Sequence, residues 1–363
     1  MRADDTIGVQ WCASATLLFQ GYDGSGSFRN LLGSFVRLQW RHSGVGSTIE
    51  PSLSLTNGSV TEGYTMQRTE VAGTSGASWR GTLGAYVGLM KPHVTVLLLG
   101  TTLAAMAVAG LPSLPVVLAT LLGGACAAGS ANAINCYWDR DIDQIMSRTR
   151  TRALPSHKVG EKQALVFGIS LGVASFVVLG LVVNLLAALL ALAAIGFYVG
   201  VYTMWLKRTT PQNIVIGGAA GAVPVLIGWA ASTGRLGLPA LCMFLIIFLW
   251  TPPHFWALSL VLRKDYERAG VPMLPVVAGE AETRKQIVLY MIALLLGSLT
   301  LFAIGTLGWF YLAVALLSGG TLLYYAIRLT RTRTLADARA FFWFSNYYLA
   351  LLFAAMVIDH LWH

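Results

Sequence analysis

Three oxygen-bearing side chains recur at intervals of four residues in the segment NCYWDRDIDQIMSRTRTRALP, residues 135–155. Asn135, Asp139 and Asp143 share one face of a helix at this spacing, because four residues make up about one helical turn. Mg²⁺ prefers oxygen ligands and is commonly shared between protein carboxylates and the phosphates of a substrate. The spacing therefore predicts a metal site for a phosphorylated substrate. Asp141 points to the opposite side and is a weaker candidate.

A second interpretation of this segment is a solvated helix end whose aspartates pair with the nearby arginines. Asn135 argues against it, because this residue lies in an apolar run, where a polar side chain is costly unless it has a partner. We therefore favour a site.

Another acidic segment, RKDYER at residues 263–268, follows a later apolar run. Two carboxylate clusters among Arg and Lys suit an Mg²⁺-bound diphosphate. The metal bridges phosphate oxygens to the aspartates, and the cations neutralise the departing group. The candidate metal-binding and catalytic residues are Asn135, Asp139, Asp143 and Asp265.

The elements that must position these residues are membrane-spanning helices. Of the 363 residues, 56% are hydrophobic and 11% charged, whereas soluble domains are about 25% charged. Runs of near twenty apolar residues can each cross a ~30 Å hydrocarbon core, and only helices satisfy their backbone there without a closed barrel. The predicted class is an all-α polytopic membrane bundle. Its nine predicted spans are 93–111, 114–136, 163–183, 185–206, 213–232, 238–262, 286–306, 308–329 and 340–361.

Charge in the connections predicts the orientation. Seventeen basic residues fall on one face of the predicted bundle, and only Arg235 falls on the other. By the positive-inside rule the amino end is cytoplasmic and the carboxyl end is outside. Of the ten acidic residues after residue 80, only Asp359 lies on the outer side. Acids follow that rule weakly, so their clustering on the basic face indicates a site there.

The net charge of +9 does not indicate nucleic-acid binding, because the basic residues lie in short loops between apolar runs. The four cysteines show no paired or CxxC spacing, which argues against a disulfide framework or a zinc site. Residues 1–80 differ from the rest, with no apolar run of membrane length. We expect a disordered or spurious extension there, with Met66 as a candidate start, and the bundle over residues 81–363.

The element TPPHFW lies inside the sixth predicted span. Pro252 and Pro253 should break or kink that helix. His254 is an ionisable side chain at membrane depth, which makes it a candidate functional residue. A histidine that bonds a backbone carbonyl freed by the prolines is the alternative. The glycine run at residues 217–221 most simply allows close helix packing.

The N-x-x-x-D-x-x-x-D pattern of residues 135–143 resembles the signature of the UbiA superfamily of intramembrane prenyltransferases. Within it, the chain resembles the protoheme IX farnesyltransferase (heme O synthase) family through five stretches over about residues 85–290. These are LMKPHVTVLLLG, NCYWDRDIDQIMSRTRTRALP, YTMWLKRTTPQNIVIGGAAGAVPVLIGWAA, FLIIFLWTPPHFWALSL and KDYERAGVPMLPVVAGE.

Two positions depart from these patterns. The family generally reads KPR where this chain has Lys91-Pro92-His93, which puts one cationic contact in doubt. The superfamily's second motif is often D-x-x-x-D, but Ala269 stands four residues beyond Asp265. Heme O synthases share that shorter form, so it weakens the expectation of a second full metal site.

The resemblance implies that farnesyl diphosphate alkylates a vinyl group of protoheme IX, giving heme O and diphosphate. It implies Mg²⁺ as cofactor, with heme as substrate. The expected setting is the lipid bilayer of a bacterial cytoplasmic membrane, with the site facing the cytoplasm. Heme A synthase and terminal-oxidase assembly proteins are candidate partners, and no nucleic acid is expected. The candidate substrate-binding residues, for diphosphate or for the heme and its propionates, are Lys91, Arg148, Arg152, Lys207, Lys264, Tyr266, His254 and Trp256. A neutral imidazole is a natural ligand for heme iron, so His254 could contact the heme, and Trp256 could pack on the macrocycle.

Two rival functions stay open. A transporter or heme exporter would also have many spans, but it predicts charges near the bilayer midplane rather than on one face. A UbiA-type enzyme acting on an aromatic acid or quinone precursor would share the aspartate motif. The TPPHFW and AGVPMLPVV elements argue against that second rival.

Overall fold

The computed structural model describes residues 52–56, 59–63 and 79–362, in two units, Met1–Ser75 and Gly76–His363. The described part of the first unit is an antiparallel hairpin of β1 (Ser52–Thr56) and β2 (Ser59–Gly63). The extension predicted for residues 1–80 otherwise lies almost wholly outside the described residues. The strands flank Asn57-Gly58, a dipeptide that favours two-residue hairpins.

Nine helical segments in the described residues are long and apolar enough to cross a membrane, which confirms the predicted number and the all-α class of the second unit. The seventh begins at Gly279 rather than near residue 286, because a charged stretch forms its first turns instead of a loop. The segments are α4 (Pro92–Ala109), α5 (Leu114–Trp138), α7 with η1 (Glu161–Val178, Leu179–Val183), α8 with η2 and α9 (Leu185–Gly196, Phe197–Leu206, Lys207–Thr209), α10 (Asn213–Thr233), α11 (Leu238–Val261), α14 (Gly279–Ala303), α15 (Trp309–Thr332) and α16 (Leu335–Trp362).

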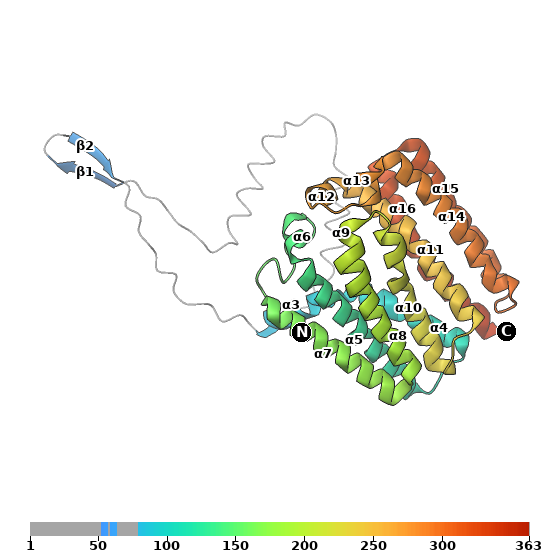
Figure 1. Ribbon diagram of the computed structural model, residues 1–363. Coiled ribbons are helices and arrows are strands. Elements are labelled where there is room, and N and C mark those ends of the chain that lie inside the picture. The colour runs from blue at the N-terminus through green and yellow to red at the C-terminus, as the bar shows by residue number, and fades with distance from the viewer. Residues whose placement is uncertain (1–51, 57–58, 64–78, 363) are drawn as a thin grey trace, which may run out of the picture. The chain divides into compact units, whose positions relative to one another are not determined.

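Short helices connect the spans at one end of the bundle. They are α6 (Arg140–Ile145), α12 (Arg263–Arg268) and α13 (Leu274–Val277), and α3 (Trp79–Leu89) precedes the first span. Figure 1 shows α6, α9, α12 and α13 gathered at that end. The two acidic segments of the sequence are α6 and α12, so the fold brings both to the same end.

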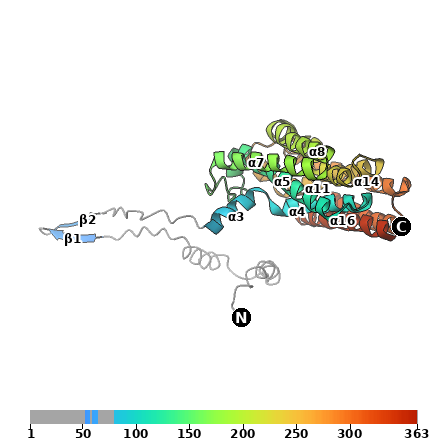
Figure 2. The same ribbon diagram turned by 90° about the horizontal axis from the view of Figure 1, so that it is seen from below.

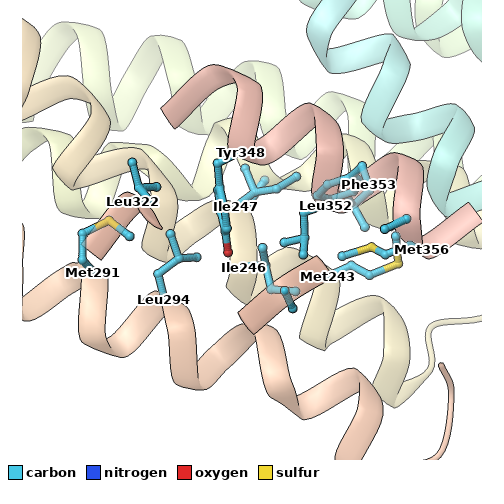
Figure 3. Close-up of a cluster of buried hydrophobic side chains, with 14 of the residues drawn as sticks. Met243, Ile246, Ile247, Met291, Leu294, Leu322, Tyr348, Leu352, Phe353 and Met356 are labelled. Atoms are coloured by element: carbon cyan, nitrogen blue, oxygen red, sulfur yellow. The ribbon is translucent and has the colours of Figure 1, made fainter. Parts of the chain in front are cut away.

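The main hydrophobic core lies between the carboxyl-terminal helices. Figure 3 shows side chains of α11, α14, α15 and α16 packed together, among them Met243, Leu294, Leu322 and Tyr348. Figure 2 shows α7 and α8 along one side of the helical unit and α4 and α16 along the opposite side. Large apolar side chains such as Leu181, 82% exposed, face outward, as the lipid-facing surface of a membrane bundle requires.

Small residues let α10 approach its neighbours closely. A Cβ added at Gly217 would clash with the ring of Tyr202, and one added at Gly228 would clash with the carbonyl oxygen of Thr102 in α4. Gly221 has open space around it. The predicted close packing therefore holds at the start of the glycine run, and the tightest approach to α4 is one that we did not predict.

The two prolines of the sixth span do not break it. α11 is continuous from Leu238 to Val261, with Pro252 and Pro253 buried inside it. A break was one of the two outcomes that we predicted for these prolines, the other being a kink, and the helix does not break. Each proline removes a single backbone donor, and the surrounding helices hold the rest of the segment in place.

Candidate functional site

Asn135, Asp139 and Asp143 are buried where α5 meets α6, with 4%, 1% and 2% of their surface exposed. The continuous helix that we predicted is divided into two at Asp139. Hydrogen bonds from Asp139 N to Asn135 O, and from Asp143 N to Asp139 O, nevertheless continue the helical pattern across the junction. The three residues therefore keep the register that their spacing predicts, and we call them the acidic stripe.

The first member of the acidic stripe, Asn135, is held from three sides. Lys91 Nζ donates to its Oδ1 at 2.9 Å, and its Nδ2 donates to Asp139 Oδ2 at 2.7 Å and to Thr203 Oγ1 at 3.1 Å. Lys91 is a predicted substrate-binding residue, and it takes the left-handed backbone conformation (φ 52°) just before Pro92. The amide thus links three spans at the acidic end of the bundle.

Asp139 has two unlike oxygens. Lys207 Nζ lies 2.5 Å from Oδ2, whereas Oδ1 is buried without a hydrogen bond and has the Arg208 guanidinium 3.7 Å away. A buried carboxylate oxygen without a donor is costly. Oδ1 is therefore the atom of the acidic stripe best placed to accept a further cation.

Asp143 faces a different cation. Arg152 NH1 lies 3.0 and 2.9 Å from its two carboxylate oxygens, and Thr149 Oγ1 donates to its backbone carbonyl. Asp141 is exposed and pairs with Arg208 through two bonds of 2.8 Å, which lower the pKa of Asp141 to about 2. Its position outside the acidic stripe agrees with its ranking as the weaker candidate.

Asp265 of α12 is joined to the first acidic segment. It accepts hydrogen bonds from the Ser147 hydroxyl and from the Arg268 guanidinium. These bonds, chiefly the one from Ser147, lower the pKa of Asp265 below its ordinary range, although burial acts in the opposite direction. A small apolar cluster, which includes Met146, Tyr266 and Met273, packs the two segments together. Asp265 therefore meets the first segment at Ser147 and not at an aspartate.

The remaining predicted cations divide into two groups. Tyr266 is buried, which raises its pKa, and the charges of Arg148 and Arg152 oppose that shift. Lys264, by contrast, is exposed. The fold thus assembles Lys91, Arg148, Arg152, Lys207 and Tyr266 around the acidic segments, and it leaves Lys264 at the surface.

Three residues near the acidic stripe were missed by sequence reasoning: Tyr198, Tyr202 and Thr203. They lie on η2, a π-helix of ten residues, where residues five apart are neighbours, and Thr203 Oγ1 donates to Tyr198 O. The two tyrosine rings are 5.3 Å apart, and Thr203 Oγ1 accepts a hydrogen bond from Asn135 Nδ2 of the acidic stripe. A π-helix cannot be read from hydrophobic spacing, so the sequence carried no signal that placed them.

Comparison with known proteins identifies the family. A model of the UbiA prenyltransferase family matches residues 97–352. The chain belongs to the UbiA prenyltransferase family. It is 54% identical over 280 residues to a protoheme IX farnesyltransferase of Gloeobacter violaceus, covering 76% of this chain and 92% of that one. A protoheme IX farnesyltransferase of a Roseiflexus species is 53% identical over 276 residues, covering 76% of this chain but only 52% of the relative, so the chain spans about half of it.

Solved structures share the UbiA fold. A structure of digeranylgeranylglyceryl phosphate synthase superposes with a TM-score of 0.66 at 18% identity, covering 78% of this chain and 99% of that one. A UbiA homolog from Archaeoglobus fulgidus, bound to GPP and Mg²⁺, gives a TM-score of 0.54 at 17% identity, covering 75% and 99%. At these identities the likeness establishes the fold alone.

The donor atoms of this UbiA prenyltransferase fit a hard divalent ion only in part. Within the described ranges, no three Asp, Glu, His or Cys side chains converge as a metal cluster. The acidic stripe does offer Asp139 Oδ1, which accepts no hydrogen bond, and the amide oxygen of Asn135, which accepts one from Lys91. That set suits Mg²⁺, which is commonly held by one or two carboxylates together with substrate phosphates. Asp143 and Asp265 are engaged by other partners.

Trp256 and His254, the two candidate residues from the TPPHFW element of this UbiA prenyltransferase, contact different neighbours. Trp256 is 2% exposed and packs edge-on against Tyr290 of α14, at a centroid distance of 5.2 Å. Trp256 therefore has almost no accessible surface for the contact with a macrocycle that we predicted. His254 is 8% exposed and turns toward α16, where its Nδ1 lies 2.7 Å from Ser345 Oγ.

Proposed function

We propose that the chain transfers the farnesyl group of farnesyl diphosphate to a vinyl group of protoheme IX, giving heme O and diphosphate. The observation that carries this proposal is the buried acidic stripe with its cations, at one end of an apolar bundle. The relatives that share more than half of their aligned residues with this chain are named for that reaction. The choice of heme among UbiA substrates rests on those relatives.

The diphosphate would bind between the acidic stripe and the cations around it. Asn135 and Asp139 would hold Mg²⁺, with Asp143 and Asp265 as further candidate ligands. The ion would stabilise the negative charge of the leaving group. Lys207, Arg152 and Arg148 would meet its oxygens directly, because charge-assisted bonds to phosphate are stronger than neutral ones. The ion pairs of Arg152 with Asp143 and of Lys207 with Asp139 support this assignment.

The proposed reaction requires that bulk water be kept away from the allylic cation. The bond between C1 of the farnesyl chain and the diphosphate oxygen breaks, and its electron pair leaves with the diphosphate. The vinyl π-electrons form the new carbon–carbon bond to C1, a water oxygen bonds to the cationic vinyl carbon, and that water loses a proton. Apolar side chains fill the core of the described bundle, and they would keep bulk water from quenching the allylic cation early.

The same proposal places the site at the cytoplasmic face of a bacterial cytoplasmic membrane. The basic loops support it, because the acidic stripe lies at the end of the bundle that carries them. Farnesyl diphosphate is soluble and charged at one end, so it would approach from that face with its chain entering the bundle. Heme A synthase and oxidase assembly proteins are candidate partners that would receive the product.

The test is to incubate the detergent-purified protein with farnesyl diphosphate, Mg²⁺ and heme, and to follow the heme by mass spectrometry. We expect a heme whose mass rises by one farnesyl group and one hydroxyl, and none when Mg²⁺ is chelated. Parallel reactions contain 4-hydroxybenzoate in place of heme. A prenylated benzoate without any modified heme would replace this function by that of an aromatic prenyltransferase.

A further inference from the structure

The helix α3 carries an exposed apolar face directly before the first span. Trp79, Leu83 and Val87 are spaced four residues apart, so they share one face, and they are 70%, 56% and 44% exposed. We call these three residues the α3 stripe. The Arg80 guanidinium lies 5.4 Å from the centroid of the Trp79 ring. A second exposed face of α3 has open space around three glycines, Gly81, Gly84 and Gly88.

The third face of α3 packs against two spans, close to their ends at the acidic end of the bundle. Ala85 and Leu89 belong to a buried apolar cluster with Ala133 of α5 and Ala164 of α7. Ala133 lies five residues before the end of α5, and Ala164 lies three residues after the start of α7, which is ~8 Å and ~5 Å along the helix axes. α3 therefore lies slightly inside the ends of the spans and not beyond them.

That depth corresponds to the boundary between headgroups and acyl chains. A helix that lies in the plane of a membrane surface buries its apolar face by ~5–10 Å at this boundary. Because α5 and α7 are membrane spans, the α3 stripe at the same depth would meet lipid rather than water. Tryptophan is enriched at this boundary, and an arginine beside it can reach headgroup phosphates. A lipid surface is thus the partner that fits the α3 stripe.

The carboxyl end of α3 is joined to the acidic stripe through two asparagines of α5. Asn132 Nδ2 donates to the carbonyl oxygen of Met90 at 3.0 Å, and Lys91 Nζ donates to Asn135 Oδ1 at 2.9 Å. Thr95 Oγ1 donates to the same Met90 oxygen at 2.9 Å. Lys91 takes a left-handed conformation here, with φ 52°, which few residues other than glycine adopt. The position of the Lys91 amine therefore depends on where α3 ends.

α3 needs support from outside itself to stay helical. It has eleven residues, three of them glycines, and short isolated helices are marginal in water. The bundle supports only one of its faces, the one that carries Ala85 and Leu89. Burial of the α3 stripe in lipid would remove the remaining apolar side chains from water and so favour the folded helix.

We propose that α3 lies in the membrane surface at the acidic end of the bundle, with the α3 stripe in lipid, and that this contact holds Lys91 against Asn135. The lipid would thereby help to assemble the site, although it takes no part in the chemistry. The inference goes beyond the proposed function, because it holds for any substrate of a UbiA site. Its experiment therefore needs no substrate.

The first measurement locates the α3 stripe by spin labels in full-length protein, in nanodiscs of phosphatidylcholine and phosphatidylglycerol. Single cysteines replace Leu83, Val87, Gly81 or Gly88 in a background whose four native cysteines are changed to alanine. We expect labels at Leu83→Cys and Val87→Cys to collide more with oxygen, which concentrates in lipid, than with a water-soluble nickel chelate. Labels at Gly81→Cys and Gly88→Cys should show the reverse.

Two outcomes of this measurement would overturn the lipid contact. If all four labels collide mainly with the nickel chelate, α3 lies in water. If the labels at Leu83→Cys and Val87→Cys are shielded from both reagents, protein covers the α3 stripe instead of lipid.

The second measurement reads the position of Lys91 from the rate at which a water-soluble reagent acetylates its amine in the same nanodiscs. Leu83→Glu should release α3 from the lipid, and Lys91 should then react ~10-fold faster, because its contact with Asn135 opens more often. Leu83→Phe keeps an apolar side chain and should react as the wild type does. Gly81→Glu adds the same charge on the other exposed face and is the matched control.

The exposed Lys158 serves as the internal reference, and its rate should not change in any variant. Equal rates for Lys91 in the wild type and in Leu83→Glu would overturn the role of lipid in positioning Lys91. An equal increase in Gly81→Glu would also overturn it, because the added charge, and not the loss of the lipid contact, would then be the cause.

Discussion

Asp139 combines a tightly held oxygen with a free one. Lys207 neutralises Oδ2, so the carboxylate can stay ionised although it is almost fully buried, and Oδ1 keeps its ligand capacity. A buried carboxylate is stable only when it is paired and hydrogen-bonded. The arrangement suits a residue that must hold a charge in readiness for a cationic ligand.

Replacing Asp139 by Asn should therefore remove catalysis with little change in shape. We expect kcat/KM for farnesyl transfer to fall by ~10²-fold or more, as when a single group that stabilises developing charge is removed elsewhere. The measurement is the rate of heme farnesylation at saturating Mg²⁺. Asp141→Asn is the matched control, because Asp141 is exposed and pairs with Arg208 outside the acidic stripe. Equal losses in both variants would contradict the role given to Asp139.

Replacing Lys207 by Met should destabilise the protein, because it leaves the Asp139 charge buried without its closest partner. Breaking a buried pair from one side costs about 3–5 kcal/mol. We expect a lower thermal unfolding midpoint in detergent for Lys207→Met, and substantial recovery in the double variant Lys207→Met, Asp139→Asn. Lys264→Met, at an exposed site, should leave the midpoint unchanged. A double variant no more stable than Lys207→Met would argue against the pair.

Among the elements, the contact between the two acidic segments is the one that completes the site. The stretch from α6 to α7 and the stretch from α12 to α13 meet through Ser147 and Asp265 and through the apolar cluster around Met146 and Met273. Neither stretch is long enough to be stable alone, since short isolated helices are marginal in water. Their order depends on each other and on the spans that they connect.

Ser147→Ala should loosen this contact in a pH-dependent way. The pKa of Asp265 is lowered chiefly by the Ser147 hydroxyl and next by Arg268. A lowered carboxyl pKa contributes stability that is full above the unfolded value, ~3.9, and that is lost as pH falls through the folded value. We expect faster limited proteolysis of the α6–α7 connection in the variant at pH 7. The difference in thermal midpoint from wild type should vanish at strongly acid pH, and a constant difference would exclude the linkage to Asp265.

Helix packing gives a second prediction at this scale. Gly228→Ala should destabilise the bundle by ~1–3 kcal/mol, because the new Cβ meets the Thr102 carbonyl oxygen, which backbone geometry holds in place. Gly221→Ala, on the same helix with open space around it, is the control. Thermal unfolding monitored by size-exclusion chromatography compares the two. An equal midpoint for both variants would show that α4 and α10 can separate at little cost.

In the helical unit, the basic connections and the acidic stripe lie at the same end of the bundle. The basic residues of the connections would serve two purposes there. By the positive-inside rule they would orient the chain in the bilayer. Arg152 and Lys207 also neutralise Asp143 and Asp139. A chain inserted the other way would present the acidic stripe to the compartment opposite the cytoplasm. Topology and activity are therefore linked.

Single cysteines should report that topology. In a background without the native cysteines, Lys158→Cys should react with a membrane-impermeant maleimide only in inverted vesicles, and Arg235→Cys only in intact spheroplasts. Both positions lie in connections between spans, on opposite sides of the predicted bundle. The cysteine-free background is the control for unspecific labelling. Labelling of Lys158→Cys in intact spheroplasts would contradict the predicted orientation and the proposed cytoplasmic position of the site.

The sequence alone determined the membrane class, the number of spans and the acidic stripe, because these follow from run length, composition and helical spacing. The tertiary structure decided which cation meets which carboxylate. Two of the contacts at the site, Lys207 with Asp139 and Ser147 with Asp265, join residues that are 68 and 118 positions apart in the sequence. The pattern of neighbouring residues does not predict contacts over such separations. The tertiary structure also placed Thr203 of η2 against Asn135 of the acidic stripe and turned His254 toward Ser345. These placements depend on how neighbouring helices pack, which side-chain spacing along one helix cannot specify.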